Sequence, residues 1–277
     1  MAQLVDFSQI FIGSYMSASK FATVDMDVIR PAVLNTLRMY RTKFVSEFGE
    51  LILCCDDRKT WRKDIFPNYK ASRKKTRAAT SIDWDNLYES LNQLKEELIE
   101  WFPYKLVQVE KAEADDIIAV LVELINERSL ILSSDKDFVQ LHGFNVRQYS
   151  PMQKKFVEGD AKWNLHEKII KGDVGDGVPN IMSDDNVFID EGRRQKPITK
   201  KKVDAWYELD PDMYCSSEML RNYNRNKQLV DLGEVPSSIR INITKQFETI
   251  AVGDRKRLLT YFINHRLKNL TESLSEF

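Results

Sequence analysis

The sequence predicts an α/β fold, because short apolar runs typical of buried strands alternate with longer stretches in which apolar residues recur at helical spacing. Three of the short runs, at residues 4–7, 51–55 and 130–132, end in aspartates or lead directly into them. In open α/β sheets, ligands bind beyond the carboxyl ends of the strands. The pattern therefore predicts a group of carboxylates at one edge of the sheet.

The first segment contains two strand candidates separated by a helix. Residues 4–7 predict a strand with Asp6 at its end, and residues 51–55 predict a second strand that leads into two further aspartates. Residues 25–48 predict a helix that stops at the glycine after it, with Pro31 in its first turn or just before it. One aspartate after one strand is usually a turn residue, but three strands that end alike favour a shared site.

A basic segment follows at residues 58–77, where Lys and Arg are interleaved with Trp61, Phe66 and Tyr69. Such a run is often only a solvated loop. Here the rings and the near absence of acids favour a segment that neutralises phosphates and offers rings for stacking on bases.

The next acids precede a predicted helix. Residues 84–101 predict an amphipathic helix and residues 105–109 a strand, which leads into Glu113, Asp115 and Asp116. The apolar face of the helix after them is expected at Ile117, Val120, Leu121 and Leu124. The helix dipole accounts for one or two such acids, at roughly 0.3–1 kcal/mol each. Three within four residues repel one another, which favours a metal ion among them.

After the run at residues 130–132, Ser134, Asp135 and Asp137 permit two interpretations: a helix cap, or a metal or acid–base site. A strand at residues 145–149 and a turn or hairpin at 151–156 complete the expected sheet. We expect an α/β catalytic domain at residues 1–157 and a helical region at 158–277. The helices of that region are predicted at residues 165–171, 197–206, 219–229, 239–247 and 255–267.

Three features of the helical region could bear on function. Residues 172–180 form a glycine-rich loop, from which Asp173 and Asp176 could reach the main site. Residues 183–196 are polar, and we expect a mobile loop there. Lys200, Lys201 and Lys202 open a helix whose N-terminus could bind backbone phosphate.

Basic residues and acids are segregated along the chain, but the overall charge does not show it, since 41 Lys and Arg balance 42 Asp and Glu to a net charge of −1. Three cysteines without a CxxC motif and three histidines indicate neither a zinc site nor a disulfide framework, and so a reducing compartment. No apolar run is long enough to span a membrane and no signal peptide is evident, so we expect a cytoplasmic protein, in the host cell if viral.

The candidate metal ligands share one chemistry, since all are carboxylates without His or Cys partners. They are Asp6, Asp56, Glu113, Asp115, Asp135, Asp137, Asp173 and Asp176. Such a set selects Mg²⁺ or Mn²⁺ and exceeds what one ion requires. Two ions about 3.5–4 Å apart would explain the excess, and that arrangement cleaves phosphodiesters.

Six motifs in order, over nearly the whole chain, resemble the flap-endonuclease (FEN/XPG-like) family of 5′ nucleases, and within it the RNase H branch of T-even-type bacteriophages. They are Val5-Asp6-Phe7-Ser8, Cys55-Asp56, Tyr69-Lys70-Ala71-Ser72-Arg73, Glu113-Ala114-Asp115-Asp116, Ser134-Asp135-Lys136-Asp137 and Gly172-Asp173-Val174-Gly175-Asp176-Gly177. One departure is that the family's Gly-x-Gly-x-Lys is replaced by the longer segment 181–202. The resemblance therefore does not settle whether residues 200–202 contact duplex DNA.

The resemblance implies a PIN-like core with a central, mostly parallel sheet, followed by a helix–three-turn–helix-type region that binds duplex DNA. It implies a first metal ion held by Asp6, Asp56, Glu113, Asp115 and Asp135, with Asp116 close by. It implies a second held by Asp137, Asp173 and Asp176, partly through water. Lys70 and Arg73 would contact the scissile phosphate, Lys74 and Lys75 would bind nucleic acid, and Tyr69 would stack on the displaced end nucleotide.

The expected function is that of a two-Mg²⁺ 5′ nuclease, with Mn²⁺ able to substitute, which removes RNA primers and 5′ DNA flaps during replication as a monomer. Expected partners are flapped or nicked duplex, RNA–DNA hybrid and a replisome single-strand-binding protein or sliding clamp. Alternatives are an RNA-cleaving PIN ribonuclease, a catalytically silent fork-binding protein, and a phosphotransferase, for which no glycine loop is present. Residues 270–277 could dock on a partner or be a frayed helix end.

Overall fold

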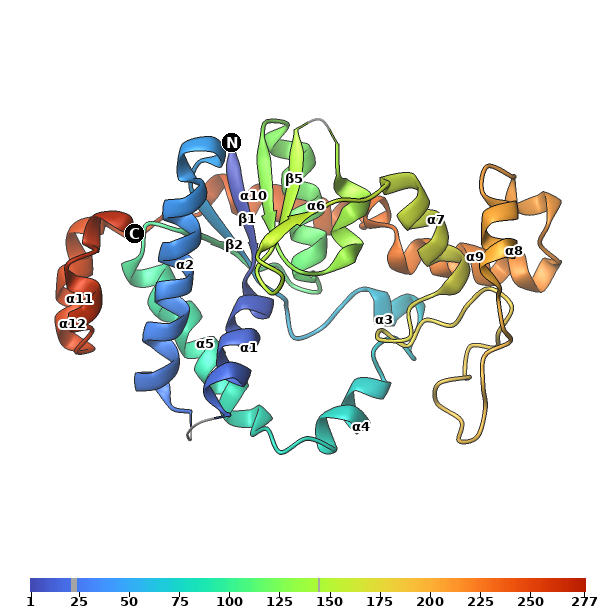
Figure 1. Ribbon diagram of the computed structural model, residues 1–277, viewed down its shortest axis with the longest axis horizontal. Coiled ribbons are helices and arrows are strands. Elements are labelled where there is room, and N and C mark those ends of the chain that lie inside the picture. The colour runs from blue at the N-terminus through green and yellow to red at the C-terminus, as the bar shows by residue number, and fades with distance from the viewer. Residues whose placement is uncertain (21–23, 144) are drawn as a thin grey trace.

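The computed structural model describes residues 1–20, 24–143 and 145–277, and it contains one six-stranded sheet (Figure 1). The strands are β1 (Ala2–Asp6), β2 (Leu51–Cys54), β3 (Lys105–Val107), β4 (Ser129–Leu132), β5 (Val146–Ser150) and β6 (Lys155–Val157). They lie in the order β3-β2-β1-β4-β5-β6; the first five are parallel, and β6 returns antiparallel to β5. The prediction of an α/β fold with a mostly parallel sheet is confirmed.

Helices cover both faces of the sheet and form all the regular structure after Val157 in the described chain. The α-helices are α1 (Phe7–Ala18), α2 (Met26–Phe48), α3 (Arg62–Ile65), α4 (Ser72–Ala78), α5 (Trp84–Trp101), α6 (Ala114–Ile125), α7 (Ala161–Lys171), α8 (Lys200–Trp206), α9 (Ser217–Val230), α10 (Ser237–Thr249), α11 (Leu258–Asn264) and α12 (Lys268–Thr271). Short 3₁₀ helices are η1 (Lys136–Leu141), η2 (Pro211–Met213), η3 (Leu232–Glu234), η4 (Arg255–Arg257) and η5 (Leu274–Glu276). The sequence pattern did not predict α1, α3 or α4.

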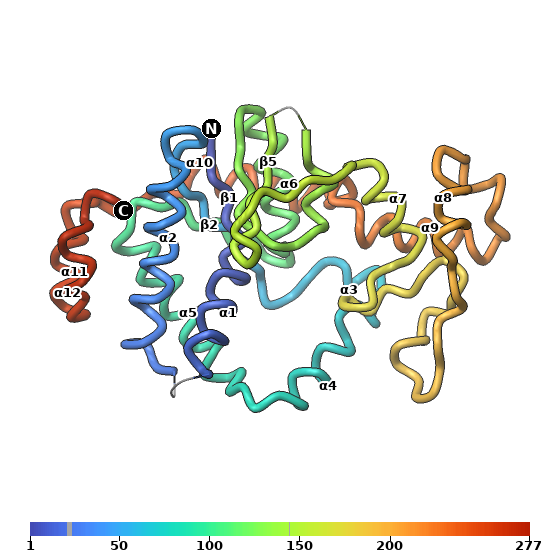
Figure 2. The backbone as a smooth tube through the Cα atoms, viewed as in Figure 1, coloured from blue at the N-terminus to red at the C-terminus, as the bar shows by residue number. Residues whose placement is uncertain are grey.

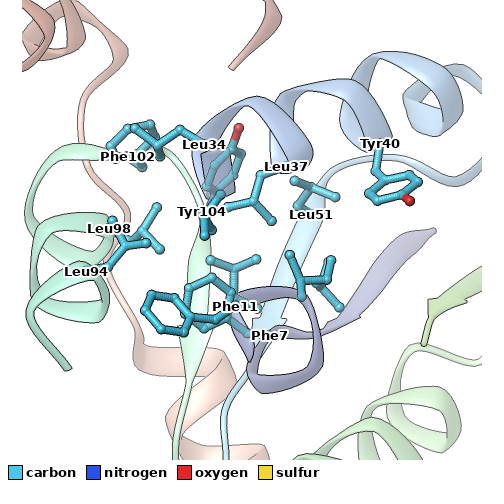
Figure 3. Packing of buried hydrophobic residues seen from close by; sticks show 14 of the residues in the cluster. Phe7, Phe11, Leu34, Leu37, Tyr40, Leu51, Leu94, Leu98, Phe102 and Tyr104 are labelled. Atoms are coloured by element: carbon cyan, nitrogen blue, oxygen red, sulfur yellow. The ribbon is translucent and has the colours of Figure 1, made fainter. Parts of the chain in front are cut away.

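One face of the sheet packs against α1, α2 and α5, where Phe7, Phe11, Leu34, Leu94 and Leu98 are among the buried side chains (Figure 3). The opposite face is covered by α6 and α10. Because α6 packs between the sheet and α10, most of its residues are buried. Ile117, Val120 and Leu121 are buried as predicted, but the prediction was wrong at Leu124, which is 39% exposed.

Pro31 lies deeper in its helix than expected, as the sixth residue of α2. Asp25 caps this helix by accepting hydrogen bonds from the backbone N–H groups of Asp27 and Val28, both at 3.0 Å. Proline lacks the N–H that would bond the carbonyl four residues earlier, so the missing hydrogen bond lies near the start of the helix. The cap and the buried face beyond it allow the helix to continue.

The C-terminal segment is packed on the core. The Phe277 ring is fully buried, with its centroid 5.8 Å from that of Phe102 and 5.2 Å from that of Phe262, and Leu270 is 5% exposed. The expectation of a frayed helix end at residues 270–277 is wrong, because the segment is packed on the core. Docking of this segment on a partner stays a prediction.

A separate group of helices, α7, α8 and α9, lies at one end of the molecule, and the α3–α4 segment spans from it back to α5 (Figures 1 and 2). Val203 of α8 is buried with Ile170 of α7 and Ile181. Residues 183–196 contain no helix or strand; their mobility and the domain division after residue 157 stay predictions. No helix among the described residues has the length and apolar composition to cross a membrane.

Candidate metal centre

Parallel pairing brings four carboxylates to one edge of the sheet. Asp6 is the last residue of β1, and Asp56 follows β2, which pairs with β1 in register at Asp6 and Cys54. Asp135 follows β4, the other neighbour of β1, and Asp115 lies in the first turn of α6. These residues are distant in sequence but adjacent at the carboxyl ends of the strands, as the pattern predicted.

The four carboxylates repel one another. Burial raises the pKa of Asp6 to about 7, and the charges of Asp56 and Asp135 add to the shift. Burial also raises the pKa of Asp115 well above its usual range, and the negative charges of Asp135 and Asp6 raise it further. Within residues 1–20, 24–143 and 145–277, no lysine or arginine forms an ion pair with any of the four. This group, the unpaired carboxylates, carries an excess of negative charge.

The other four candidate ligands are each paired with a cation. Glu113 Oε1 lies 2.5 Å from Lys70 Nζ, and Glu113 Oε2 lies 2.9 Å from Arg62. Asp176 lies 2.5 Å from Arg73. The remaining two, Asp137 and Asp173, share one lysine, Lys168, whose Nζ is 2.7 Å from Asp173 and also bonds Asp137.

The cations change how these carboxylates titrate. Burial opposes ionisation of Glu113, but Lys70 and Arg62 outweigh it and lower its pKa. The pKa of Asp176 is lowered in the same way by Lys70 and Arg73. Burial raises the pKa of Asp137 to about 6, although Lys168 opposes the shift. The chain thus neutralises one half of the acidic cluster internally and leaves the other half uncompensated.

The unpaired carboxylates fit a divalent cation by their chemistry, because they offer only oxygen donors and their charge lacks a counter-ion. They do not form a finished site, since no three Asp, Glu, His or Cys residues of the described chain are arranged closely enough to hold an ion.

Several of the carboxylates also cap helices. Asp6 accepts from Gln9 N and caps α1, and Asp135 accepts from Asp137 N and caps η1, at 3.1 and 2.9 Å. The capping interpretation of Asp135 is therefore correct. It does not exclude metal binding, since each of these caps uses one carboxylate oxygen.

Asp116 bonds to residues outside the group of unpaired carboxylates. Its side chain is fully buried and lies 2.8 Å from Arg62, 3.0 Å from Trp61 Nε1 and 2.9 Å from the backbone N of Glu113. In this structure Asp116 serves the capping box of α6 and the Arg62 ion pair, and its place beside the metal ions stays a prediction.

The aromatic residues of the basic segment are buried in this structure. Trp61, Phe66 and Tyr69 are only 4%, 4% and 3% exposed. The Tyr69 hydroxyl donates to Glu113 and Asp176, at 3.0 and 2.8 Å. The rings pack between the core and the helical region, so the exposure expected of them is wrong. The stacking of Tyr69 on the end nucleotide stays a prediction, and it would require the ring to leave this position.

The turn that carries Lys70 is held by the glycine-rich loop. Lys70 has φ = 57°, a left-handed conformation that is costly for a residue with a side chain. Its N–H donates to the carbonyl of Asp176 at 2.7 Å. At Gly177 (φ 71°), a Cβ would lie 3.2 Å from the carbonyl oxygen of Asn68, so this close approach favours glycine.

The predicted nucleic-acid-binding lysines lie in two places. Lys74 and Lys75 are exposed on α4, while Lys200 to Lys202 are exposed in the first turn of α8, at the far end of the helical region (Figure 1). The sequence analysis missed Arg62 and Lys168. Neither has a local signature, because each is recognisable only from the acids that the fold places beside it.

Two family models together match nearly the whole chain. The family described as "5'-3' exonuclease, N-terminal resolvase-like domain" matches residues 2–169, and that described as "T4 RNase H, C terminal" matches residues 159–277. Ribonuclease H of Enterobacteria phage T4 is 33% identical, over 99% of this chain and 95% of that protein. A flap endonuclease Xni of Psychromonas ingrahamii is 31% identical over 40% of this chain and 39% of its own length.

Solved structures with the same fold include the bacteriophage T5 D15 flap endonuclease in a pseudo-enzyme–product complex with DNA and metal ions. It matches with a TM-score of 0.66 and 17% identity, over 90% of this chain and 98% of that one. The T5 5′-exonuclease with bound zinc matches with a TM-score of 0.63 and 18% identity. Since the exonuclease domain covers more than half of the chain and a relative is similar over nearly all of it, the chain belongs to the 5′–3′ exonuclease family, with the C-terminal domain of the T4 RNase H type.

Proposed function

We propose that this 5′ nuclease hydrolyses phosphodiesters near the 5′ ends of RNA primers and DNA flaps, with two Mg²⁺ ions at the carboxylate cluster. Membership of the family makes the chain a nuclease, and so a phosphodiesterase. The observation that supports the finer proposal is the excess charge of the unpaired carboxylates, Asp6, Asp56, Asp115 and Asp135. Hydrolysis by this route needs no side-chain nucleophile.

The unpaired carboxylates would hold the first ion, together with Glu113 once its pairs with Lys70 and Arg62 loosen. Asp137, Asp173 and Asp176 would serve the second ion, partly through water. Lys168 would have to move away from Asp137 and Asp173 for that ion to bind, since its ammonium group now neutralises both carboxylates. When bound, divalent ions supply Lewis-acid stabilisation of phosphate oxygens and a nucleophilic water at neutral pH.

Lys70 and Arg73 would contact the scissile phosphate and offset the charge that builds on it in the transition state. Both already lie at the cluster through Glu113 and Asp176, and Arg73 is about half exposed, which suits exchange of a carboxylate for a phosphate. Lys74 and Lys75 would continue the contact along α4. Lys200 to Lys202 would bind duplex backbone within a helix–three-turn–helix-type region.

The proposed substrates are duplex with a 5′ flap or nick and RNA–DNA hybrid, and a single-strand-binding protein or sliding clamp stays a predicted partner. The RNA-cleaving PIN alternative has no counterpart to the second region, which here matches the T4 RNase H C-terminal domain over residues 159–277. A monomer in the host cytoplasm stays our prediction.

The test is incubation with 5′-labelled flap, nicked duplex and RNA–DNA hybrid, each with Mg²⁺ and with chelator. We expect Mg²⁺-dependent cleavage that falls at least about 100-fold in Asp135→Asn, because even the residues that support metal ligands contribute 10–100-fold. Asp64→Asn is the matched control, since this exposed carboxylate pairs with Lys111 outside the cluster. Full activity of Asp135→Asn, or equal losses in both variants, would contradict the site assignment, and absence of any cleavage would support the silent fork-binding alternative.

A further inference from the structure

The connection between α9 and η3 forms an apolar wall of the acidic site. A small cavity of about 10 Å³ is lined by Asp115, Asp137, Asp173 and Asp176. The same cavity is lined by Leu229, Val230 and Leu232, which are 2%, 7% and 3% exposed. We call residues 229–232 the clamp segment. Its backbone lies where the helical region meets the sheet domain.

Arg62 holds one side of the clamp segment. Its Nε donates to the carbonyl of Leu229 at 2.8 Å, and the same guanidinium lies 2.9 Å from Glu113 and 2.8 Å from Asp116. Arg62 is 2% exposed, so these bonds form away from water, where leaving one unmade is costly. The end of α9 and the start of α6 are thereby fixed to one rigid group.

Gln140 holds the other side and uses both ends of its amide. Its Nε2 donates to the carbonyl of Val230 at 3.1 Å, and its Oε1 accepts from the backbone N of Leu232 at 2.9 Å. Gln140 belongs to η1, which Asp135 caps and which contains Asp137. The amide therefore ties the clamp segment to the turn that presents two of the proposed metal ligands.

The clamp segment continues into the helical region without a flexible joint. Three residues before it in α9, Asn226 is fully buried and donates to the carbonyls of Ile169 and Pro179, at 2.8 and 2.9 Å. Pro179 lies in the loop that carries Asp173 and Asp176. Asn226 thus ties the end of α9, next to the clamp segment, to α7 and to the loop that carries Asp173 and Asp176.

We propose that Gln140 is a positioning residue that sets where the substrate strand lies relative to the metal ligands, and so which phosphodiester is cut. This inference rests on the proposed function, in which the helical region grips the duplex. A displacement of about 1 Å can cost roughly 100-fold in rate, so one amide at this junction is sufficient to control position.

The test compares wild type, Gln140→Leu and a control, Gln246→Leu, on a 5′-flap substrate with products resolved to one nucleotide. Gln246 makes a similar bond, accepting from Gln108 N at 3.0 Å, but joins α10 to the chain after β3, outside the cavity. For Gln140→Leu we expect a single-turnover rate about 10–100-fold lower and a spread of products around the wild-type position. We expect duplex affinity in Ca²⁺ to stay within about twofold, since the helical region is intact. Gln246→Leu should keep the wild-type products.

The possible failures are distinguishable. If wild type cleaves and Gln140→Leu gives the same products at the same rate, the positioning role is wrong and the proposed function stands. If Gln140→Leu loses duplex affinity in proportion to rate, the amide only supports the fold of the helical region, and the inference is also overturned. Should Gln140→Leu fail to fold, Gln140→Glu keeps the bond to Leu232 and is expected to spread the products to a smaller degree; unchanged products there would refute the role. Absence of cleavage by wild type would remove the proposed function and this inference together.

Discussion

Replacing Asp6 by asparagine should stabilise the metal-free protein at pH 8 and not at pH 4. The pKa of Asp6 is raised from 3.8 to about 7, chiefly by burial. One pKa unit corresponds to 1.36 kcal/mol, so ionising Asp6 in the folded state costs up to about 4 kcal/mol. Asparagine keeps the oxygen that accepts from Gln9 N and carries no charge. We expect Asp6→Asn to gain roughly 2–4 kcal/mol at pH 8, where the wild-type group is ionised.

The sign follows from proton binding. Between pH 4 and pH 7 the folded state holds a proton on Asp6 that the unfolded chain has released, so the stability of the metal-free wild type falls as pH rises through this range. The gain from Asp6→Asn should therefore be small near pH 4, grow up to about pH 7 and then level off. Taking the difference between variant and wild type removes the titration of groups that both share.

Urea unfolding with chelator at pH 4.5, 6 and 8 measures this difference, with Asp64→Asn as a control that should change little at any pH because its ion pair is exposed. Adding Mg²⁺ at pH 8 should then stabilise the wild type, by about 2.7 kcal/mol at 100 times the dissociation constant, and should stabilise Asp6→Asn much less. A gain independent of pH, or a destabilised variant at pH 8, would show that Asp6 is not an uncompensated charge.

Two further predictions concern other packed groups. Lys168→Met should lower the stability of the metal-free protein at pH 8 by about 2–3 kcal/mol, because it leaves Asp137 and Asp173 without their shared cation. Burial raises the pKa of Asp137 to about 6 against the opposing charge of Lys168, so loss of Lys168 raises that pKa further; the stability loss should therefore shrink as the pH falls toward 6 and level off below it. Urea unfolding at pH 8 and pH 5 checks it. Phe277→Ala should cost about 3–5 kcal/mol, because the ring is fully buried; a melting temperature equal to that of wild type would mean that the segment is not packed in solution.

Local patterns predicted the strands and the acids at their ends. The apolar runs that become β1, β2 and β4 are short and are followed closely by aspartates, and parallel pairing places those ends on one edge of the sheet. They lie side by side because β2 and β4 are the two neighbours of β1. The order itself was not predicted, because nothing in a single strand states which neighbour it pairs with. The eight candidate carboxylates were chosen by residue type, and their roles as ligands stay a prediction.

The division of the acids into paired and unpaired groups could not be predicted from the sequence. It depends on Arg62 and Lys168, which come from α3 and α7 and meet their partners only in the fold. A basic residue in a polar segment looks the same whether it faces solvent or a buried acid. The burial of the aromatic rings at 61, 66 and 69 was missed for the same reason, since an aromatic residue among lysines can face inward as well as outward.

Asp6 and Asp135 each cap a helix and also belong to the proposed metal site, so a substitution can remove the charge of the site and leave the helix cap in place. Asparagine caps helices about as well as aspartate, so Asp→Asn at position 6 or 135 preserves the hydrogen bond to the helix while it removes the charge. One base change suffices for that exchange in the gene. Folded but inactive forms are therefore only a single mutational step away, which makes them accessible to evolution as DNA-binding decoys and to the experimenter as traps for an uncut substrate.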